Sequence, residues 1–313
     1  MKTVAIVNPT SGYRRARRLW PRLLESLGET GAGVATWWTE WPGHAETLAA
    51  RARREGFDRV VAVGGDGTLL EVVNGLWWES RMPLPSVGVV PFGTGCDYVR
   101  SFDLGRGLRD QVITALGQAT LTVSLGLVRL QGYDGQPRQR VFVNVLGLGF
   151  DAQVIAGFRQ QRLRLPGKTA YFLSGLKELG RLRHHLITGE LNGKRLETEA
   201  ALVVLGLGRY FGGGMMITPG ASPQAGHFQV VLAQKLSRLE LLGLLPGLYF
   251  GRHLNHPRVS AAYASHIKIN ADPPADVEAE GELEGTTPLN VTIIPRALRI
   301  AAPSLAASLL LRP

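Results

Sequence analysis

The sequence is poor in cysteine, with Cys96 alone among 313 residues. One thiol cannot form a disulfide within the chain, so the fold must be stable without one. The N-terminal segment MKTVAIVNP passes directly into a strand-like run and lacks the apolar stretch of a secretory signal peptide. Both absences favour a protein of the reducing cytosol.

Long apolar runs are also missing. The longest, such as residues 241–250, contain proline and glycine and fall well short of the roughly 18 residues that a membrane-spanning helix needs. We therefore expect any contact with a membrane to be peripheral. The composition, with 45% hydrophobic and 19% charged residues, is that of a globular chain, and the length favours two domains.

Acidic residues are outnumbered, because 25 Asp and Glu stand against 35 Lys and Arg, which leaves a formal net charge of +10. A basic surface attracts phosphate groups, nucleic acid or anionic lipid headgroups, and charge alone does not choose among them. Arg14, Arg15, Arg17 and Arg18 cluster beside the first turn of the chain. They either contact such phosphates or form a solvated helix face.

The first 120 residues alternate apolar, strand-like runs with amphipathic stretches, which is typical of a parallel sheet covered by helices. The expected strands are 2–7, 34–39, 60–63 and 87–91. The expected helices are 13–27, 43–55 and 67–76. We therefore predict an α/β nucleotide-binding domain over residues 1–120.

From residue 121 the pattern changes to strands with few helices. The expected strands are 123–130, 140–145, 185–191, 199–207, 228–232, 266–269 and 289–294, with helical inserts at 164–182 and 239–254. Asp134-Gly135 and Asn192-Gly193 carry the signals of tight hairpin turns. This predicts a β-rich second domain over residues 121–295, which would hold the substrate.

The sharpest local signal is the glycine-dense turn at residues 64–68, GGDGT, which follows the third expected strand and opens a helix. Backbone N–H groups at a helix N-terminus favour phosphate, and glycines let the phosphate approach closely. The G-x-G-x-x-G spacing of dinucleotide sites is absent, and Asp66 would repel a pyrophosphate. An acid here favours Mg²⁺ between Asp66 and a nucleotide. The plain alternative is a tight turn without a ligand.

Two more turns of this kind follow the first and fourth strands, at residues 8–12 and 91–97. In an open parallel sheet the loops at the carboxyl ends of the strands converge on one crevice. We therefore expect the three loops to line one site. Asp66 and Asp97 would place two carboxylates there, suited to a metal ion and to phosphoryl transfer.

Several motifs follow one another in a specific order: NPTSG at 8–12, GHA at 43–45, GGDGTLLEVVNGL at 64–76, PFGTGCDYVR at 91–100, NVLGLGFDAQV at 144–154, GRYFGGGMMITPGAS at 208–222 and EGELEGTTPLNVTIIPRALRI at 280–300. In this order they resemble the bacterial diacylglycerol kinase and lipid kinase family. That family includes sphingosine kinases and is distantly related to NAD kinases. The resemblance extends over nearly the whole chain.

The resemblance implies an NAD kinase/diacylglycerol kinase-like fold, with a mostly parallel α/β domain completed by residues 296–313 and a sandwich-like β-rich domain. It implies transfer of the γ-phosphate of ATP, with Mg²⁺, to the hydroxyl of diacylglycerol or a related lipid alcohol at a membrane surface. The expected partners are therefore ATP, this lipid and anionic lipid headgroups, and not nucleic acid. A homodimer is left open.

Residue pattern and resemblance together give a candidate site. The residues expected to bind the nucleotide are Asn8, Ser11, Gly12, Gly64, Gly65, Asp66, Gly67, Thr68, Gly93 and Thr94. The expected metal ligands are Asp66 and Asp97. The expected catalytic residues are Glu280, Glu282 and Asp97, with one of the two glutamates accepting the proton of the lipid hydroxyl.

Four positions depart from the family pattern. Cys96 replaces the usual Asn before Asp97, Glu280 replaces the first acid of Asp-Gly-Glu, and Leu207 replaces an expected Asn. Ala225 stands where bacterial members have the acid of a second, structural metal site, and a methyl group cannot ligate Mg²⁺. These changes keep an alternative open, a catalytically inactive homologue that binds nucleotide or lipid.

Overall fold

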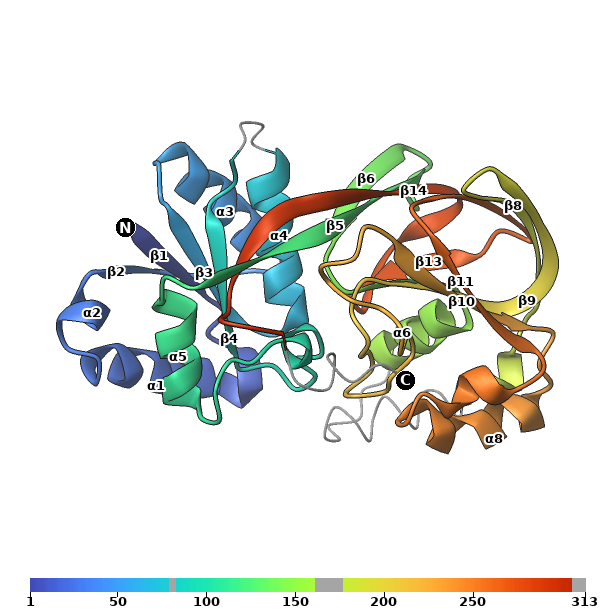
Figure 1. Cartoon of the computed structure of the whole chain (residues 1–313), viewed down its shortest axis with the longest axis horizontal. Helices are drawn as coiled ribbons and strands as arrows, with labels where there is room; N and C mark the ends of the chain where they lie inside the picture. Colours follow the sequence, from blue (N-terminus) through green and yellow to red (C-terminus); the bar gives the residue numbers. More distant parts are fainter. Residues whose placement is uncertain (79–82, 161–176, 306–313) are drawn as a thin grey trace. The chain divides into compact units, whose positions relative to one another are not determined.

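The structure is a computed structural model that describes residues 1–78, 83–160 and 177–305 (Figure 1). The chain divides into two compact units. Unit 1 comprises Met1–Val123 and Arg296–Pro313, and unit 2 comprises Ser124–Pro295. Most of the helix expected over 164–182 lies outside the described residues.

The sheet of unit 1 has parallel strands in the order β2-β1-β3-β4. Their bounds are β1 Thr3–Val7, β2 Val34–Trp38, β3 Arg59–Gly64 and β4 Ser86–Pro91. The last part of β14 (Glu282–Ala301) lies parallel to β4, with Ile300 opposite Val87. Every residue of β1 and β3 is buried, which is the pattern of a parallel sheet with helices on both faces.

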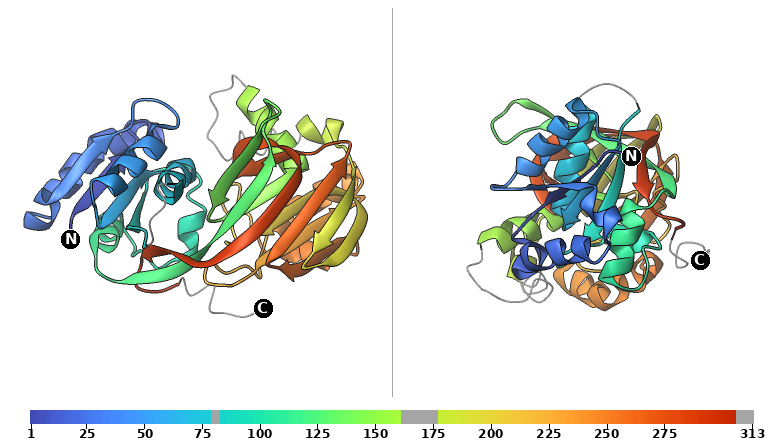
Figure 2. Two further views of the ribbon diagram at one scale, coloured as in Figure 1. Left: turned by 90° about the horizontal axis from the view of Figure 1, so that it is seen from above. Right: turned by 90° about the vertical axis from the view of Figure 1, so that its left-hand side faces the viewer.

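The helices of unit 1 follow the strands in alternation, as the sequence predicted. They are α1 Ser11–Glu25, α2 Glu29–Ala32, α3 His44–Arg54, α4 Asp66–Trp78 and α5 Leu108–Leu116, with a 3₁₀ turn η1 at Tyr98–Ser101. Trp20 of α1 and Val112 of α5 share one core cluster with Val61 and Val63 of β3. Helices α3 and α4 pack together on the other side of the sheet (Figures 1 and 2). The sequence did not predict α2 or α5.

Unit 2 is built from antiparallel strands. They are β5 Thr120–Gln131, β6 Pro137–Phe142, β7 Val145–Gly149, β8 His185–Leu191, β9 Lys194–Gly206, β10 Phe228–Gln234, β11 Val259–Ala264, β12 His266–Asp272 and β13 Asp276–Ala279, together with β14. The order β11-β10-β9-β7-β13-β14 forms one path, and β8 links β9 to β12. The long strand β9 pairs with β8 near its start and with β10 near its end. Long strands that change partners produce the predicted sandwich-like, β-rich domain.

The strand expected over 140–145 is wrong, because β6 ends at Phe142 and β7 begins at Val145. Val143 and Asn144 lie between these two strands, and their N–H groups donate to the Glu280 carboxylate. An apolar run therefore contains a break that its residues do not signal. The hairpin turn at Asn192-Gly193 is as predicted and joins β8 to β9.

Helices α6 (Phe150–Gln160) and α8 (Arg238–Leu248) pack on the sheet of unit 2. Phe150 of α6 and Leu241 of α8 share a core cluster with Val231 of β10. Short 3₁₀ turns stand at η2 Leu179–Arg181 and η3 Arg252–Asn255. The helix expected over 239–254 is thus α8 and η3, separated by Gly251 at φ +68. Among the described helices, none combines the length and hydropathy needed to cross a membrane.

Candidate functional site

Three loops of unit 1 begin at one edge of the sheet. The strand register places Val7 opposite Val63 and Gly64 opposite Pro91, so β1, β3 and β4 end side by side. The backbone N–H of Asn8 donates to Val63 O at 3.0 Å. The three glycine-containing turns therefore lie together, at the carboxyl ends of parallel strands where ligands bind in folds of this type.

Glycine lets two of these loops pack backbone against backbone. A Cβ on Gly93 would lie 2.5 Å from the Cα of Gly65, and a Cβ on Gly65 would lie 3.2 Å from the Cα of Gly93. Gly12 adopts φ +59, and a side chain there would collide with the carbonyl oxygen of Phe92. The N-terminus of α4 is thus surrounded by backbone, with the first N–H groups of the helix lacking partners within it. This arrangement suits phosphate.

Asp66, the first residue of α4, fastens the loop at 91–97. Its Oδ2 accepts the N–H of Asp97 at 3.1 Å, and its Oδ1 accepts the N–H of Tyr98 at 3.2 Å. Burial raises the pKa of the Asp66 carboxyl, and the negative charge of Asp97 raises it further, while the two amide donors lower it. The carboxylate therefore holds the loop at 91–97 in place and is also a candidate metal ligand.

Asp66 and Asp97 both reach the space beside Gly95. A Cβ on Gly95 would lie 3.3 Å from Asp66 Oδ2 and 3.5 Å from Asp97 Oδ2. Asp97 is buried, and its Oδ1 pairs with the Nε of Arg100 at 3.2 Å. Nowhere in the part of the chain that the structure describes do three or more His, Cys, Asp or Glu form a metal cluster. Two carboxylates fit Mg²⁺ whose remaining ligands are phosphate and water oxygens.

The residues expected to bind nucleotide all belong to this edge of unit 1. Ser11 begins α1 and donates its N–H to Asn8 O at 3.2 Å. The Nδ2 of Asn8 approaches the Oγ1 of Thr68 at 3.4 Å, and Thr94 is exposed. The structure brings together Asn8, Ser11, Gly12, Gly64, Gly65, Asp66, Gly67, Thr68, Gly93, Thr94 and Asp97.

Cys96, where the family pattern has Asn, adopts φ +48. Asn tolerates this left-handed conformation better than most residues, which accounts for the usual choice. Its thiol donates to Gly93 O at 3.3 Å, and burial raises the pKa of that thiol to about 12. Cys96 is therefore a protonated, structural residue of the loop.

The expected catalytic glutamates lie in unit 2, at the turn between β13 and β14. Glu280 adopts φ +55 and is buried. Its Oε1 accepts the N–H groups of Val143 at 2.9 Å and Asn144 at 2.6 Å. Glu282, the first residue of β14, is exposed. The two glutamates thus differ, since backbone amides orient one carboxylate while the other faces solvent.

Sequence reasoning missed a pair of buried acids behind this turn. Glu278 accepts the N–H of Gly281 at 2.8 Å through Oε2, and its other oxygen meets Asp151 beside Gly147. Burial raises the pKa of Asp151 to about 7; burial and the Asp151 charge raise the pKa of Glu278 as well. Asp151 Oδ2 and Glu278 Oε1 are both buried without a hydrogen-bond donor among the described residues, which favours a protonated carboxyl in this pair. The available signal was Asp151, an acid that directly follows the apolar run at 145–150.

Sequence reasoning also missed an apolar pocket of ≈ 440 Å³ in unit 2, between α6, α8 and the sheet. Its walls include Val154, Leu202, Val204 and Leu245. Among the described lining residues, Asp151 is the only acid. A pocket with this lining accepts hydrocarbon.

The two-domain fold is NAD kinase-like, and its loop cluster in unit 1 is suited to phosphate. The family described as "Diacylglycerol kinase catalytic domain" matches residues 2–128, and the family described as "YegS C-terminal NAD kinase beta sandwich-like domain" matches residues 144–302. The chain therefore belongs to the diacylglycerol kinase family, and it is a lipid kinase. The resemblance seen in the sequence motifs is confirmed.

The similar proteins match this chain over 95% or more of its length. The diacylglycerol kinase of Staphylococcus haemolyticus is 28% identical over 298 residues, which cover 95% of this chain and 87% of the relative. That of Staphylococcus aureus strain MRSA252 is 28% identical over 299 residues, with coverage of 96% and 91%. A solved structure of a diacylglycerol kinase from Bacillus anthracis has a TM-score of 0.71 at 17% identity and covers 96% of both chains. Yeast NADH kinase, complexed with NADH, has a TM-score of 0.53 at 14% identity, with coverage of 96% and 82%.

Proposed function

We propose that the protein transfers the γ-phosphate of ATP to the hydroxyl of diacylglycerol or a related lipid alcohol at a membrane surface. The observation that carries the substrate class is the apolar pocket of unit 2, with Asp151 in its wall. Each methylene that leaves water contributes about 0.8 kcal/mol, so acyl chains bind well in such a pocket. A diacylglycerol, a sphingoid base and a ceramide all share this chemistry.

The loop cluster of unit 1 is the proposed nucleotide site. N–H groups of the first turn of α4 would donate to phosphate oxygens, with Asn8 and Thr68 beside them. Asp66 and Asp97 would hold Mg²⁺, which when bound neutralises phosphate charge during transfer. The hydrogen bond from the Asp97 N–H to Asp66 Oδ2 would keep both carboxylates in place before the nucleotide binds.

Glu280 is the proposed base. As the lipid oxygen forms its bond to the γ-phosphorus, the bond to the bridging oxygen breaks, ADP leaves, and the hydroxyl proton moves to the carboxylate. The N–H groups of Val143 and Asn144 hold Oε1, which fixes the orientation of the carboxylate. Glu282 and Asp97 are the alternatives for this role.

The test is incubation with labelled ATP and a mixed lipid extract, followed by identification of the labelled product. We expect a phosphorylated lipid alcohol, with transfer to purified diacylglycerol, sphingoid base and ceramide then compared. Transfer to no lipid, with ATP still protecting the protein against thermal unfolding, would favour the inactive homologue. The names of the relatives give that alternative no support.

The acyl site has its own test. Leu245→Trp places a larger side chain inside the pocket, so we expect turnover of long-chain substrates to fall while the ATP affinity is unchanged. Leu186→Trp, on the exposed face of β8, is the matched control. Equal turnover of long-chain lipid by both variants would place the acyl chains elsewhere.

A further inference from the structure

Helix α8 and the turn after it expose an apolar surface. The exposed fractions are 81% for Leu239, 40% for Leu242, 46% for Tyr249 and 71% for Phe250, and Pro246 is exposed between them. We call these five residues the α8 surface. Isolated exposed apolar residues are common in proteins, whereas a contiguous group marks an interaction surface.

From Leu241 onward helix α8 is apolar on all sides, and the α8 surface is its exposed side. Its members recur at the spacing of a single helix face, whereas Leu241 points to the opposite side and packs in the core against Phe150. Residues 241–251, LLGLLPGLYFG, contain no charge. A helix that covers a core normally turns polar side chains to water. Beyond Arg238 the outer face of α8 lacks them and is therefore suited to an apolar environment.

Basic residues border this surface. Between Lys235 and Arg258 the sequence has four Lys or Arg and one acid, Glu240. Arg238 precedes the apolar run and Arg252 follows it, with the Arg252 guanidinium 5.6 Å from the centre of the Phe250 ring. An apolar strip with cations at both ends complements an anionic bilayer, because the apolar side chains enter the acyl region while the cations meet headgroup phosphates.

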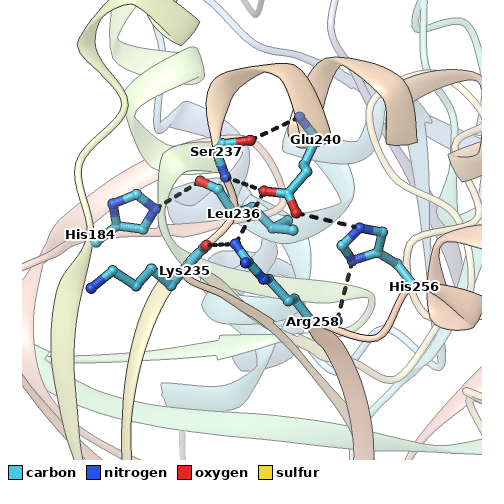
Figure 3. Close-up of polar contacts among 7 residues, drawn as sticks. All are labelled: His184, Lys235, Leu236, Ser237, Glu240, His256 and Arg258. Atoms are coloured by element: carbon cyan, nitrogen blue, oxygen red, sulfur yellow. Dashed lines mark hydrogen bonds and ion pairs between the residues drawn. The ribbon is translucent and has the colours of Figure 1, made fainter.

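A polar network holds the N-terminus of α8 in place (Figure 3). Ser237 and Glu240 form a capping box, with Ser237 Oγ accepting the N–H of Glu240 at 3.2 Å. The Arg258 guanidinium donates to Glu240 Oε2 at 3.2 Å and to Lys235 O at 2.9 Å. His184 Nε2 contacts Leu236 O at 2.9 Å. These contacts fix the end of the helix on unit 2, so its apolar face is preformed.

The α8 surface also borders the pocket. Leu242, Pro246 and Tyr249 belong to the surface and line the pocket wall. We infer that the α8 surface is where the protein docks on an anionic phospholipid bilayer, and that the lipid substrate passes from the bilayer into the pocket beside α8. The second part rests on the proposed function. Docking itself does not, because it requires only the surface and its cations.

The test uses the double variant Leu239→Glu/Phe250→Glu. Neither residue lines the pocket and both are exposed, so we expect folding to be preserved. Leu186→Glu is the control for placing a carboxylate at an exposed leucine away from α8, here on β8. Binding is measured by co-sedimentation with vesicles of phosphatidylcholine, with and without phosphatidylglycerol. Turnover is measured on long-chain diacylglycerol in these vesicles and on a water-soluble short-chain diacylglycerol.

We expect the double variant to lose about tenfold or more in vesicle affinity, because two apolar side chains no longer enter the bilayer. Turnover in vesicles should fall with it, whereas turnover of the soluble substrate and all properties of the control should match the parent. Arg238→Gln/Arg252→Gln should weaken binding only to vesicles with phosphatidylglycerol, most strongly at low salt.

Parent-like vesicle binding by the double variant would overturn the inference, as would an equal loss in the Leu186→Glu control. If the double variant instead disrupts a dimer and leaves vesicle binding intact, the α8 surface is a protein interface and the inference is wrong. A parent that binds vesicles through this surface but phosphorylates neither substrate would refute the proposed function alone.

Discussion

The carboxylate of Asp66 holds the backbone of Asp97, whose N–H donates to Asp66 Oδ2 at 3.1 Å. The first residue of α4 thereby positions the loop that carries the second acid of the site. Stability and the proposed catalysis are coupled at this point, because the same side chain serves both. Substitutions that separate charge from hydrogen bonding can therefore distinguish the two roles.

Asp66→Ala should lower both stability and activity. Two N–H groups lose their acceptor, which costs about 1 to 3 kcal/mol in the free energy of unfolding when they stay buried. Asp66→Asn keeps one acceptor oxygen, so it should be the more stable variant while still losing most of its turnover. Urea unfolding and labelled-phosphate transfer measure the two effects. Asp110→Ala, at an exposed acid of α5, is the control and should resemble the parent. Full activity in Asp66→Asn would remove Asp66 from the metal site.

Gly93→Ala should separate the loops that form the proposed phosphate site. The new Cβ would lie 2.5 Å from the Cα of Gly65, a backbone atom that cannot rotate away. We expect a loss of about 1 to 3 kcal/mol in stability and a larger Kd for ATP, measured by calorimetry. Gly33→Ala is the matched control in unit 1, where the nearest atom would be 3.9 Å away. Unchanged ATP affinity in Gly93→Ala would place the nucleotide elsewhere.

The fold class was predictable because its signals are local. Apolar runs ending in glycine-containing turns mark β1, β3 and β4, and the register of a parallel sheet then brings their loops together. Strand β13 was not predictable, because its sequence Asp-Val-Glu-Ala carries two acids and reads as a polar segment. Its place in the sheet comes from pairing with β7 and β14, which are distant in sequence.

The same contrast holds for the site. The spacing of Asp66 and Asp97 and their glycine neighbours indicated that they would lie together, because both follow adjacent strands. The contact between Asp151 and Glu278 joins residues 127 positions apart, and nothing in the local sequence of either predicts the other. The pocket beside α8 was missed for a related reason. An apolar helix sequence does not tell which of its sides covers a core.

The Asp151 and Glu278 pair should make stability depend on pH. Both folded pKa values are raised, to about 7 for Asp151 against its ordinary value of 3.8, so the folded state holds protons that the unfolded state releases. This contribution to stability is fully present below about pH 4 and is lost as the pH rises through about 7. Glu278→Gln removes one acid and keeps a donor to Asp151 and an acceptor for Gly281. The variant should therefore gain stability relative to the parent at pH 8, by on the order of 1 to 3 kcal/mol.

The measurement is urea unfolding of both proteins at several pH values between 4 and 8, with Glu282→Gln as the exposed control. The difference between Glu278→Gln and the parent should grow with pH, whereas the control should follow the parent. A difference that does not change with pH would mean that Glu278 is ionised in the folded protein at neutral pH, contrary to the direction of its shift.

Glu280→Gln tests the proposed base with little disturbance of the fold. The amide oxygen of Gln can still accept the N–H groups of Val143 and Asn144, so the break between β6 and β7 should persist. What is lost is the capacity to take a proton, and we expect turnover to fall by about 10² to 10⁴ with little change in ATP affinity. Glu280→Ala would remove the acceptor as well, and should add a loss of about 1 to 3 kcal/mol in stability.

Glu282→Gln changes an exposed carboxylate one residue beyond Gly281 and should retain much more activity. If Glu280→Gln turns over lipid as fast as the parent while Glu282→Gln does not, the solvent-facing glutamate is the base and Glu280 only holds the turn.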